Sequence, residues 1–247
     1  MKLYLKQIWS MVKSRLSVFR RSSRIKRKPQ ETKQSEAEYY TELFTANKEW
    51  SKPTPNRDEG ARWQAIEKLI LHLKSCDSPP ANIELKILDV GCGRGWLTFL
   101  MSKHGSVQGI EPVAAVVDHG KRLFPTLDIS SRTTRDLLVC HKHHYDLVVS
   151  SEVMEHIPDG QKLSFVRDIH DLIRASGFAI ITTPRKEAQS QWVTPGQPIE
   201  EWMDEIALEK LFTENGFKAH ICIRVPLCPY EGAAEIPIYQ AWLFQKV

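Results

Sequence analysis

Residues 85–111 constrain the fold of this chain more than any other stretch. An apolar run from Leu85 to Val90 has the pattern of a buried strand, and a helical pattern begins at Trp96. Three alternating glycines separate the two. Glycine lets the backbone turn tightly and approach a ligand closely, and the start of a helix is a ready binding site for polar groups. We therefore predict a strand–turn–helix unit that binds a ligand through Gly91, Cys92, Gly93 and Gly95.

Two acidic residues beside this turn indicate the kind of ligand. Glu111 lies 20 residues after Gly91, where an acid can reach the two hydroxyls of a ribose. A glycine-rich turn also serves NAD or FAD, or no ligand at all. The spacing here is GxGxG, however, and Asp89 lies two residues before the first glycine, where an anion repels a pyrophosphate and suits an ammonium group. S-adenosylmethionine, which carries an ammonium group, a sulfonium and a ribose, is the predicted cofactor.

Three segments carry a family resemblance. They are Leu88–Gly95, Tyr145–Pro158 and Gly177–Pro184. In order and spacing they resemble the first motif, the strand-4 motif and strand 5 of class I S-adenosylmethionine-dependent methyltransferases, in the ubiquinone-biosynthesis O-methyltransferase-like (type 11/12) group. The resemblance covers about residues 60–247. It implies that Asp89 and the glycine turn hold the methionine end and that Glu111 holds the ribose. Asp136 is the nearest candidate for the family's adenine-contacting acid, and Ser151 lies beside the cofactor.

Strand and helix patterns alternate after residue 85. The predicted strands are 85–90, 106–110, 127–130, 145–150, 178–183, 217–224 and 238–245, and the predicted helices are 95–103, 113–123, 160–175 and 206–215. Such alternation is typical of an α/β fold with a doubly wound, mostly parallel, seven-stranded sheet. Only a short connection joins the last two strands, so we expect them to be antiparallel neighbours. Ligands in such sheets bind beyond the carboxyl ends of the strands, which places the glycine turn, Glu111 and residues 151–156 around one cleft.

Glu152, Glu155 and His156 form a second chemical cluster, just past the strand at 145–150. Carboxylates and an imidazole can ligate Mg²⁺ or another divalent ion, and the resemblance to metal-binding O-methyltransferases implies such a site. The same residues can move a proton, and we predict His156, with Glu155 beside it, as the base toward a hydroxyl acceptor. A structural role, with the acid capping the next turn, is the remaining alternative. No histidine occurs at 183–186, which departs from the small-RNA 2′-O-methyltransferases.

The N-terminal part of the chain is strongly basic. Residues 1–34 contain eleven Lys or Arg and one acid, a net charge of +10, whereas the whole chain carries +4 and the remainder therefore −6. Apolar residues recur at helical spacing over 5–19, which predicts an amphipathic helix. We expect residues 1–28 to associate with an anionic membrane surface. A mitochondrial transit peptide, a nucleic-acid-binding arm and a solvated leader without a partner are the alternatives.

Two parts are expected along the chain: an extension with a polar linker at 1–37, and a methyltransferase domain at 38–247. In the second part, 38–80 has the pattern of a helical cap, with a helix at 39–50 and another capped by Asp58, and 85–247 forms the sheet core. Tyr39, Tyr40 and Trp50 form either a lid over the cleft or a packed aromatic cluster. Scattered cysteines and the lack of a long apolar stretch fit a cytoplasmic location, with the mitochondrial matrix as the alternative.

The expected activity is methylation of a hydroxyl on a small molecule: a phenol, a quinone precursor or a sugar-like metabolite. Trp192 and Trp202, after the strand at 178–183, suit an apolar or ring-shaped acceptor, or simply pack together. An RNA ribose 2′-O-methyltransferase and a non-catalytic cofactor-binding scaffold tethered by the basic tail are the alternatives. The net charge of −6 on the remainder argues against a nucleic-acid groove.

Overall fold

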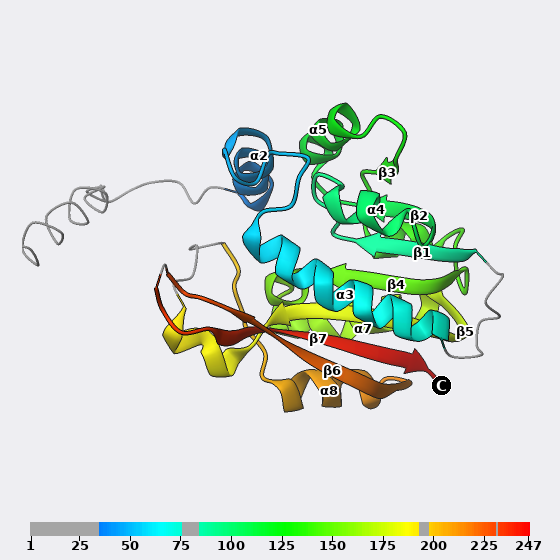
Figure 1. Cartoon of the computed structure of the whole chain (residues 1–247). Coiled ribbons are helices and arrows are strands. Elements are labelled where there is room, and N and C mark those ends of the chain that lie inside the picture. Colours follow the sequence, from blue (N-terminus) through cyan, green and yellow to red (C-terminus); the bar gives the residue numbers. More distant parts are fainter. Residues whose placement is uncertain (1–34, 76–83, 193–197, 231) are drawn as a thin grey trace, which may run out of the picture. The chain divides into compact units, whose positions relative to one another are not determined.

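The computed structural model describes residues 35–75, 84–192, 198–230 and 232–247. The predictions for the basic tail, and for most of the linker, lie outside these residues. The compact unit begins at Ser35 and contains a seven-stranded sheet in the order β3-β2-β1-β4-β5-β7-β6 (Figure 1). The predicted α/β fold with a mostly parallel sheet is thereby confirmed. Within the described residues, no helix combines the length and apolar character needed to cross a membrane.

The strands follow the apolar runs of the sequence. Their bounds are β1 Leu85–Val90, β2 Gly105–Ile110, β3 Asp128–Ser130, β4 Tyr145–Ser151, β5 Ile173–Pro184, β6 Phe217–Leu227 and β7 Ile236–Lys246. The first five strands pair in parallel, and β7 lies antiparallel between β5 and β6, which confirms the predicted C-terminal pair. The strand order reverses between β1 and β4. A reversal of this kind leaves a crevice at the carboxyl ends of the strands, where ligands bind in open α/β sheets.

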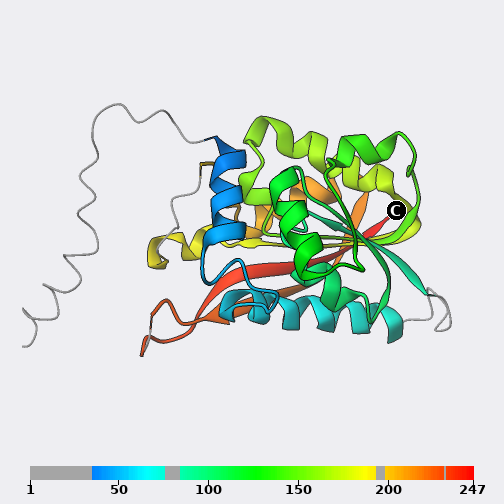
Figure 2. The same cartoon turned by 90° about the horizontal axis from the view of Figure 1, so that it is seen from above.

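Helices cover both faces of the sheet (Figures 1 and 2). Their bounds are α2 Glu36–Ala46, α3 Arg57–Ser75, α4 Trp96–Met101, α5 Ala114–Leu123, α6 Thr134–Leu138, α7 Asp159–Leu172 and α8 Glu205–Thr213, with 3₁₀ turns η1 Met154–His156 and η2 Lys186–Gln191. Residues of α3 and α4 share one buried cluster with one face of the sheet, and residues of α6, α7 and α8 share another with the opposite face. The arrangement is the doubly wound one that the sequence predicted.

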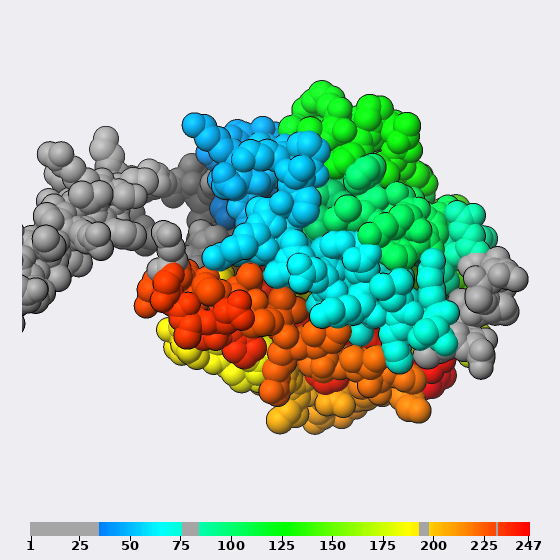
Figure 3. Space-filling model, viewed as in Figure 1, coloured from blue at the N-terminus to red at the C-terminus, as the bar shows by residue number. Residues whose placement is uncertain are grey.

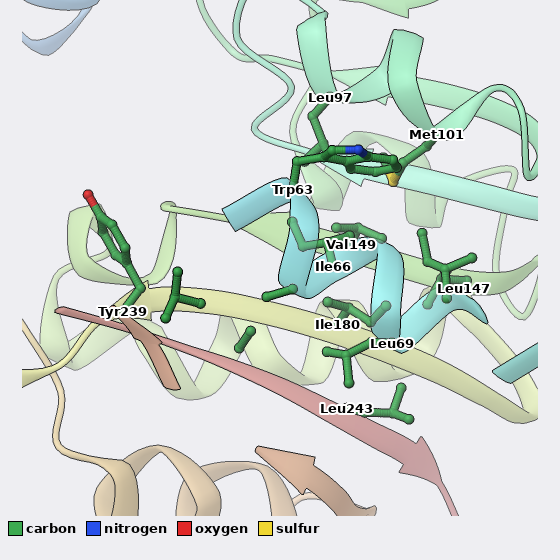
Figure 4. Packing of buried hydrophobic residues seen from close by; sticks show 14 of the residues in the cluster. Trp63, Ile66, Leu69, Leu97, Met101, Leu147, Val149, Ile180, Tyr239 and Leu243 are labelled. Carbon is green, nitrogen blue, oxygen red and sulfur yellow. The ribbon is translucent and has the colours of Figure 1, made fainter. Parts of the chain in front are cut away.

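The two buried clusters show why β4 is apolar at successive positions. Ile66 and Leu69 of α3 point onto the sheet, where they meet side chains of β4 and β5, whereas the Trp63 ring lies beside Leu97 and Met101 of α4 (Figure 4). In β4, Leu147 and Val149 belong to this cluster, whereas Val148 belongs to the one under α7 and α8. Successive side chains of a strand point to opposite faces, so an uninterrupted apolar run in β4 serves both layers.

The predicted helix at 160–175 is wrong at its end. α7 stops at Leu172, and β5 begins at Ile173, which pairs with Tyr145 before the ladder shifts to Leu147 and Phe178. The apolar pair Leu172 and Ile173 fits either period, and pairing with β4 decides between them. The helix α6, which the pattern did not predict, has only five residues and owes its start to a capping box.

The first residues of α3 also differ from the prediction. Asn56, and not Asp58, caps this helix. The Asn56 side-chain oxygen accepts the Glu59 N–H at 2.9 Å, and the Glu59 carboxylate accepts the Asn56 N–H at 2.8 Å. The two residues therefore form a reciprocal capping box, and Glu59 is fixed at the start of the helix.

A buried ion pair joins α3 to the glycine turn. Arg94 is fully buried, and its two terminal nitrogens donate to the Glu59 carboxylate at 2.7 and 2.8 Å. The Arg94 guanidinium also donates to the carbonyls of Lys52, at 2.5 Å, and Thr54, at 3.3 Å. One side chain thereby connects the glycine turn, the first turn of α3 and the segment that follows α2.

Replacing Arg94 is expected to destabilise the fold strongly. Arg94→Ala leaves the Glu59 carboxylate buried without a counter-charge, and loss of one partner of a buried pair typically costs about 3–5 kcal/mol. Urea denaturation measures the free energy of unfolding. Arg57→Ala is the matched control, because Arg57 pairs with Asp58 on the surface with a side chain that is 58% exposed, and such pairs contribute about 1 kcal/mol or less. Equal losses in the two variants would contradict this account.

Candidate functional site

A cavity of about 670 Å³ lies at the carboxyl ends of the central strands. Its walls come from the residues that follow β1, β2, β4 and β5, and from α2, α3 and β7. The helix α2 contacts α5, and these two segments, blue and green in Figure 3, meet on the surface. The described part of the chain thus brings together the glycine turn, Glu111 and residues 151–156, as the sheet rule predicted.

The glycine turn forms the floor of the cavity where β1 ends. Gly91 has φ +72°, and a Cβ atom there would lie 2.4 Å from a methyl group of Val153. Gly93 has φ +51°, and the Phe44 ring lies 3.4 Å from where its Cβ would be. Side chains other than glycine are therefore strained at both positions. Gly91, Cys92 and Gly93 line the cavity, whereas Gly95 precedes α4 outside it.

Two buried carboxylates flank this turn. The Asp89 carboxylate accepts the Thr98 hydroxyl at 2.6 Å, and burial, with a further contribution from the Glu111 charge, raises the pKa of Asp89 to about 7. The Glu111 carboxylate accepts the N–H groups of Gly93 at 3.3 Å and Val113 at 3.0 Å, and burial raises its pKa. Both acids line the cavity, and a cation near them would favour their ionised forms.

Arg62 is a cavity residue that the sequence pattern did not single out. It is 4% exposed, its Nε lies 4.0 Å from a Glu152 oxygen, and its guanidinium carbon lies 4.8 Å from the centre of the Tyr239 ring. No hydrogen-bond partner reaches the buried Arg62 Nε among the described residues. A buried donor without a partner is costly, so this atom is a natural contact for an acidic group of a ligand.

The β4 end supplies the cluster that the sequence predicted. His156 Nδ1 lies 2.8 Å from the Ile199 carbonyl, and Nε2 lies 3.6 Å from a Glu155 oxygen. A carbonyl only accepts hydrogen bonds, so Nδ1 carries the proton and Nε2 has a free lone pair. Burial lowers the pKa of His156 and favours the neutral ring. Glu155 is buried, accepts the Thr183 hydroxyl at 3.1 Å, and has a pKa raised to about 7 by burial.

Glu152 adopts an uncommon backbone conformation in the same cluster. Its φ is +59°, which non-glycine residues rarely adopt, and such strain concentrates at functional sites. Its carboxylate accepts the Thr182 hydroxyl at 3.1 Å. Burial, and then the nearby Glu155 charge, raise its pKa. Ser151, which lies beside it and also lines the cavity, bonds the same Thr182 hydroxyl at 2.8 Å.

The described residues show no divalent-metal site at the predicted cluster. Glu152, Glu155 and His156 are held by separate partners, and residues 35–75, 84–192, 198–230 and 232–247 contain no group of three potential ligands arranged to hold a metal ion. Asp136 also stands apart. It closes the capping box of α6 with Thr133 and does not line the cavity.

Aromatic side chains of the N-terminal cap border the cavity. Tyr40 and Trp50 line it, and Tyr39 packs edge-on against Tyr40 with ring centroids 5.3 Å apart. This arrangement fits both the lid and the packed aromatic cluster. Phe44 also lines it, and the sequence prediction omitted this residue. Phe44 lies one helical turn after Tyr40, so the i, i+4 spacing was the signal that would have found it.

The sequence of this chain is similar to those of known methyltransferases. Residues 43–220 match the family described as "Methyltransferase domain". The ubiquinone biosynthesis O-methyltransferases of Citrobacter koseri and Actinobacillus pleuropneumoniae are 32% and 33% identical over 110 and 107 residues, which are 42% and 40% of this chain. The chain spans about half the length of the curated relatives it matches, 45% of each of these two.

Solved structures share the fold at low identity. N-methyltransferase NodS of Bradyrhizobium japonicum, in complex with S-adenosylhomocysteine, has a TM-score of 0.64 at 14% identity, with 86% of this chain and 99% of that chain covered. A Burkholderia thailandensis 1,6-didemethyltoxoflavin-N1-methyltransferase has a TM-score of 0.62 at 17% identity, covering 86% and 87%. The fold is that of class I S-adenosylmethionine-dependent methyltransferases. The chain belongs to this methyltransferase family.

Binding of S-adenosylhomocysteine is expected to strengthen as pH rises from 6 to 8. Asp89, with a pKa of about 7, is mostly protonated at pH 6, and the pairing with the ligand's ammonium group that the sequence predicts requires it to lose a proton. Calorimetry in buffers of different ionisation enthalpy measures both the affinity and the proton released. Asp89→Asn should weaken binding at pH 8 by about tenfold or more and flatten the pH profile. Asp118→Asn, on the exposed side of α5, is the control. A flat profile in the unmodified protein would refute this role.

Proposed function

We propose that this chain transfers a methyl group from S-adenosylmethionine to a hydroxyl of a small ring-bearing molecule, in the class of phenols and quinone precursors. The observation that carries the proposal is that His156 and the glycine turn border one cavity. The curated relatives are O-methyltransferases of ubiquinone biosynthesis. The Burkholderia structure holds a small molecule, 1,6-didemethyltoxoflavin, together with S-adenosylhomocysteine. Both findings support a small-molecule acceptor.

The residues at the β1 and β2 ends fit the cofactor. Asp89 supplies a carboxylate for the ammonium group, and the unpartnered Nε of Arg62 supplies a donor for the carboxylate of the methionine end. Glu111 offers acceptors for the ribose hydroxyls, in place of its present bonds to backbone N–H groups. The turn glycines keep Cβ atoms out of this space. Ser151 lines the cavity nearby, whereas the adenine contact predicted for Asp136 has no support, since Asp136 lies elsewhere.

His156 is the proposed base. S-adenosylmethionine supplies a methyl group on a sulfonium, which is already a strong electrophile. The protein's tasks are to exclude water, to align the hydroxyl and to take its proton. The Ile199 carbonyl fixes the ring so that Nε2 has the free lone pair. With the cofactor bound, the methyl carbon–sulfur bond would break as the oxygen–carbon bond forms, leaving S-adenosylhomocysteine, and Nε2 of His156 would accept the hydroxyl proton. Tyr40, whose ring centroid is 5.8 Å from that of His156, covers this end of the cavity.

Transfer of label is the direct test of the acceptor class. The full chain is incubated with methyl-labelled S-adenosylmethionine and with cell extract separated into small metabolites, lipids and RNA. Label is expected in small metabolites or lipids with a ring hydroxyl. Since the β4 cluster does not converge as a metal site, EDTA is expected to leave the rate unchanged. Label confined to RNA would support ribose methylation instead, and no transfer to any fraction would favour a binding scaffold.

Removal of the base is expected to lower turnover but not cofactor binding. His156→Ala should reduce kcat with a hydroxyl acceptor by about 10²-fold or more, since a positioned general base typically contributes 10²–10⁴-fold. Affinity for S-adenosylhomocysteine should stay within about twofold, because the glycine turn and Asp89 are untouched. His220→Ala is the control, as His220 is exposed on β6 and bonded to Gln245. An unchanged kcat in His156→Ala would remove this residue from the mechanism.

A further inference from the structure

The cavity has two chemically different halves. The donor half is lined by the glycine turn, Asp89 and Glu111, at the ends of β1 and β2. The acceptor half is lined by Tyr40, Glu155, His156, Trp192, Glu200 and Trp202, from α2 and from the residues after β4 and β5. The two halves lie on opposite sides of the point where the strand order reverses.

Carboxylates predominate among the charged side chains of the lining. Among the described residues, eight acids border the cavity, and Arg62 and His156 are the basic side chains that do so. Five of these acids already have a partner or a proposed task. Arg94 neutralises Glu59, Arg57 pairs with Asp58, and Arg62 lies 4.0 Å from Glu152. Asp89 and Glu111 are assigned to the ammonium group and the ribose of the cofactor. Glu36, Glu155 and Glu200 remain around the acceptor half.

Glu200 is held firmly beside the base. The Trp202 indole N–H donates to the Glu200 carboxylate at 3.0 Å, and Trp202 is buried. The flanking backbone is fastened to the β4 end: the Ile199 carbonyl accepts from His156, and the Glu201 N–H donates to the Glu155 carbonyl at 2.8 Å. These bonds on either side fix the position of the Glu200 carboxylate relative to His156.

The Arg62 charge is not available to neutralise these carboxylates when an anionic acceptor binds. Its charge is matched by Glu152 and by the face of the Tyr239 ring, to which its guanidinium carbon lies at 4.8 Å. Its unpartnered Nε marks the cavity as a site for a ligand with an acidic group, and the methionine end of the cofactor supplies that group. An anionic acceptor would then meet Glu200, Glu155 and Glu36, with no further basic side chain among the described lining residues to offset their charge, at a repulsive cost.

We infer that the acceptor is a ring-bearing molecule that is neutral or cationic, and that Glu200 and Glu36 select against carboxylated and phosphorylated acceptors. The aromatic side chains of Tyr40, Trp192 and Trp202 supply the apolar surface for the ring. The carboxylates supply acceptors for its hydroxyl or ammonium donors. This inference rests on the proposed function, because it assigns the charge of the molecule that is methylated.

Three dihydroxyphenyl ligands of nearly equal size test the inference: 3,4-dihydroxybenzoate, its methyl ester and 3,4-dihydroxybenzylamine. Calorimetry with the full chain at pH 7.5, with and without S-adenosylhomocysteine, measures their affinities. The ester and the amine are expected to bind at least about tenfold more tightly than the benzoate, a difference of about 1.4 kcal/mol. Glu200→Gln should reduce this difference to about threefold, mainly through tighter binding of the benzoate.

Two further variants complete the design. Glu36→Gln, on the exposed first turn of α2, should also reduce the difference in affinity between the benzoate and the other two ligands. This variant replaces Glu200→Gln as the test if Glu200→Gln fails to fold. Glu214→Gln, whose side chain is 63% exposed, is the matched control and should leave all three affinities unchanged. The inference is overturned if benzoate binds as tightly as the ester, if none of the three binds, or if both cavity variants preserve the full difference. Failure of the proposed function would be seen in a different experiment, as no transfer of label to any hydroxyl. The titrations measure binding alone and do not depend on turnover, so the two failures can be distinguished.

Discussion

The buried contact between Arg94 and Glu59 is the interaction on which the site depends. Arg94 belongs to the glycine turn, and Glu59 belongs both to the capping box of α3 and to this ion pair. Arg94 also donates to the backbone at Lys52 and Thr54, just after α2. Because the two side chains are buried and joined by two hydrogen bonds, they hold together the turn that borders the cofactor space and the helix that carries Arg62.

This fixed ion pair supports a cavity in which four buried carboxylates lie close together, an arrangement that costs free energy. Asp89, Glu111, Glu152 and Glu155 are largely removed from water within one crevice, and burial raises the pKa of each. Grouped acids repel when ionised, so they stay together only where the surrounding backbone and hydroxyl groups hold them. Thr98, Thr182 and Thr183 do so by donating to three of these four carboxylates. The site is therefore ordered for ligands that bring positive charge.

The sheet could be predicted from the sequence because its central strands β1 and β4 are clear apolar runs, and the glycine turn because its spacing is local. The predictions were wrong where contacts with residues distant in the sequence, or with a capping partner, set the bounds of an element. Ile173 joins β5 through pairing with β4, and Asn56 caps α3 through Glu59, an N-x-x-E pattern that the sequence showed and the prediction passed over. Arg62 and Arg94 could not be found from periodicity, since a charged residue on a helix or in a turn normally faces water. Only the tertiary fold shows that these two are buried.

The reversal of strand order between β1 and β4 has an evolutionary consequence. Of the residues proposed to hold the donor, the glycine turn, Asp89 and Glu111 lie on one side of that point, at the ends of β1 and β2. The opposite side is built from η1, the segment after β5 and the surface helix α2, which contains no buried residue. Changes there alter little of the packing that sustains the sheet. Proteins that descend from such a chain can therefore change their acceptor while they keep the cofactor site. Acceptor specificity is then expected to diverge faster than the fold.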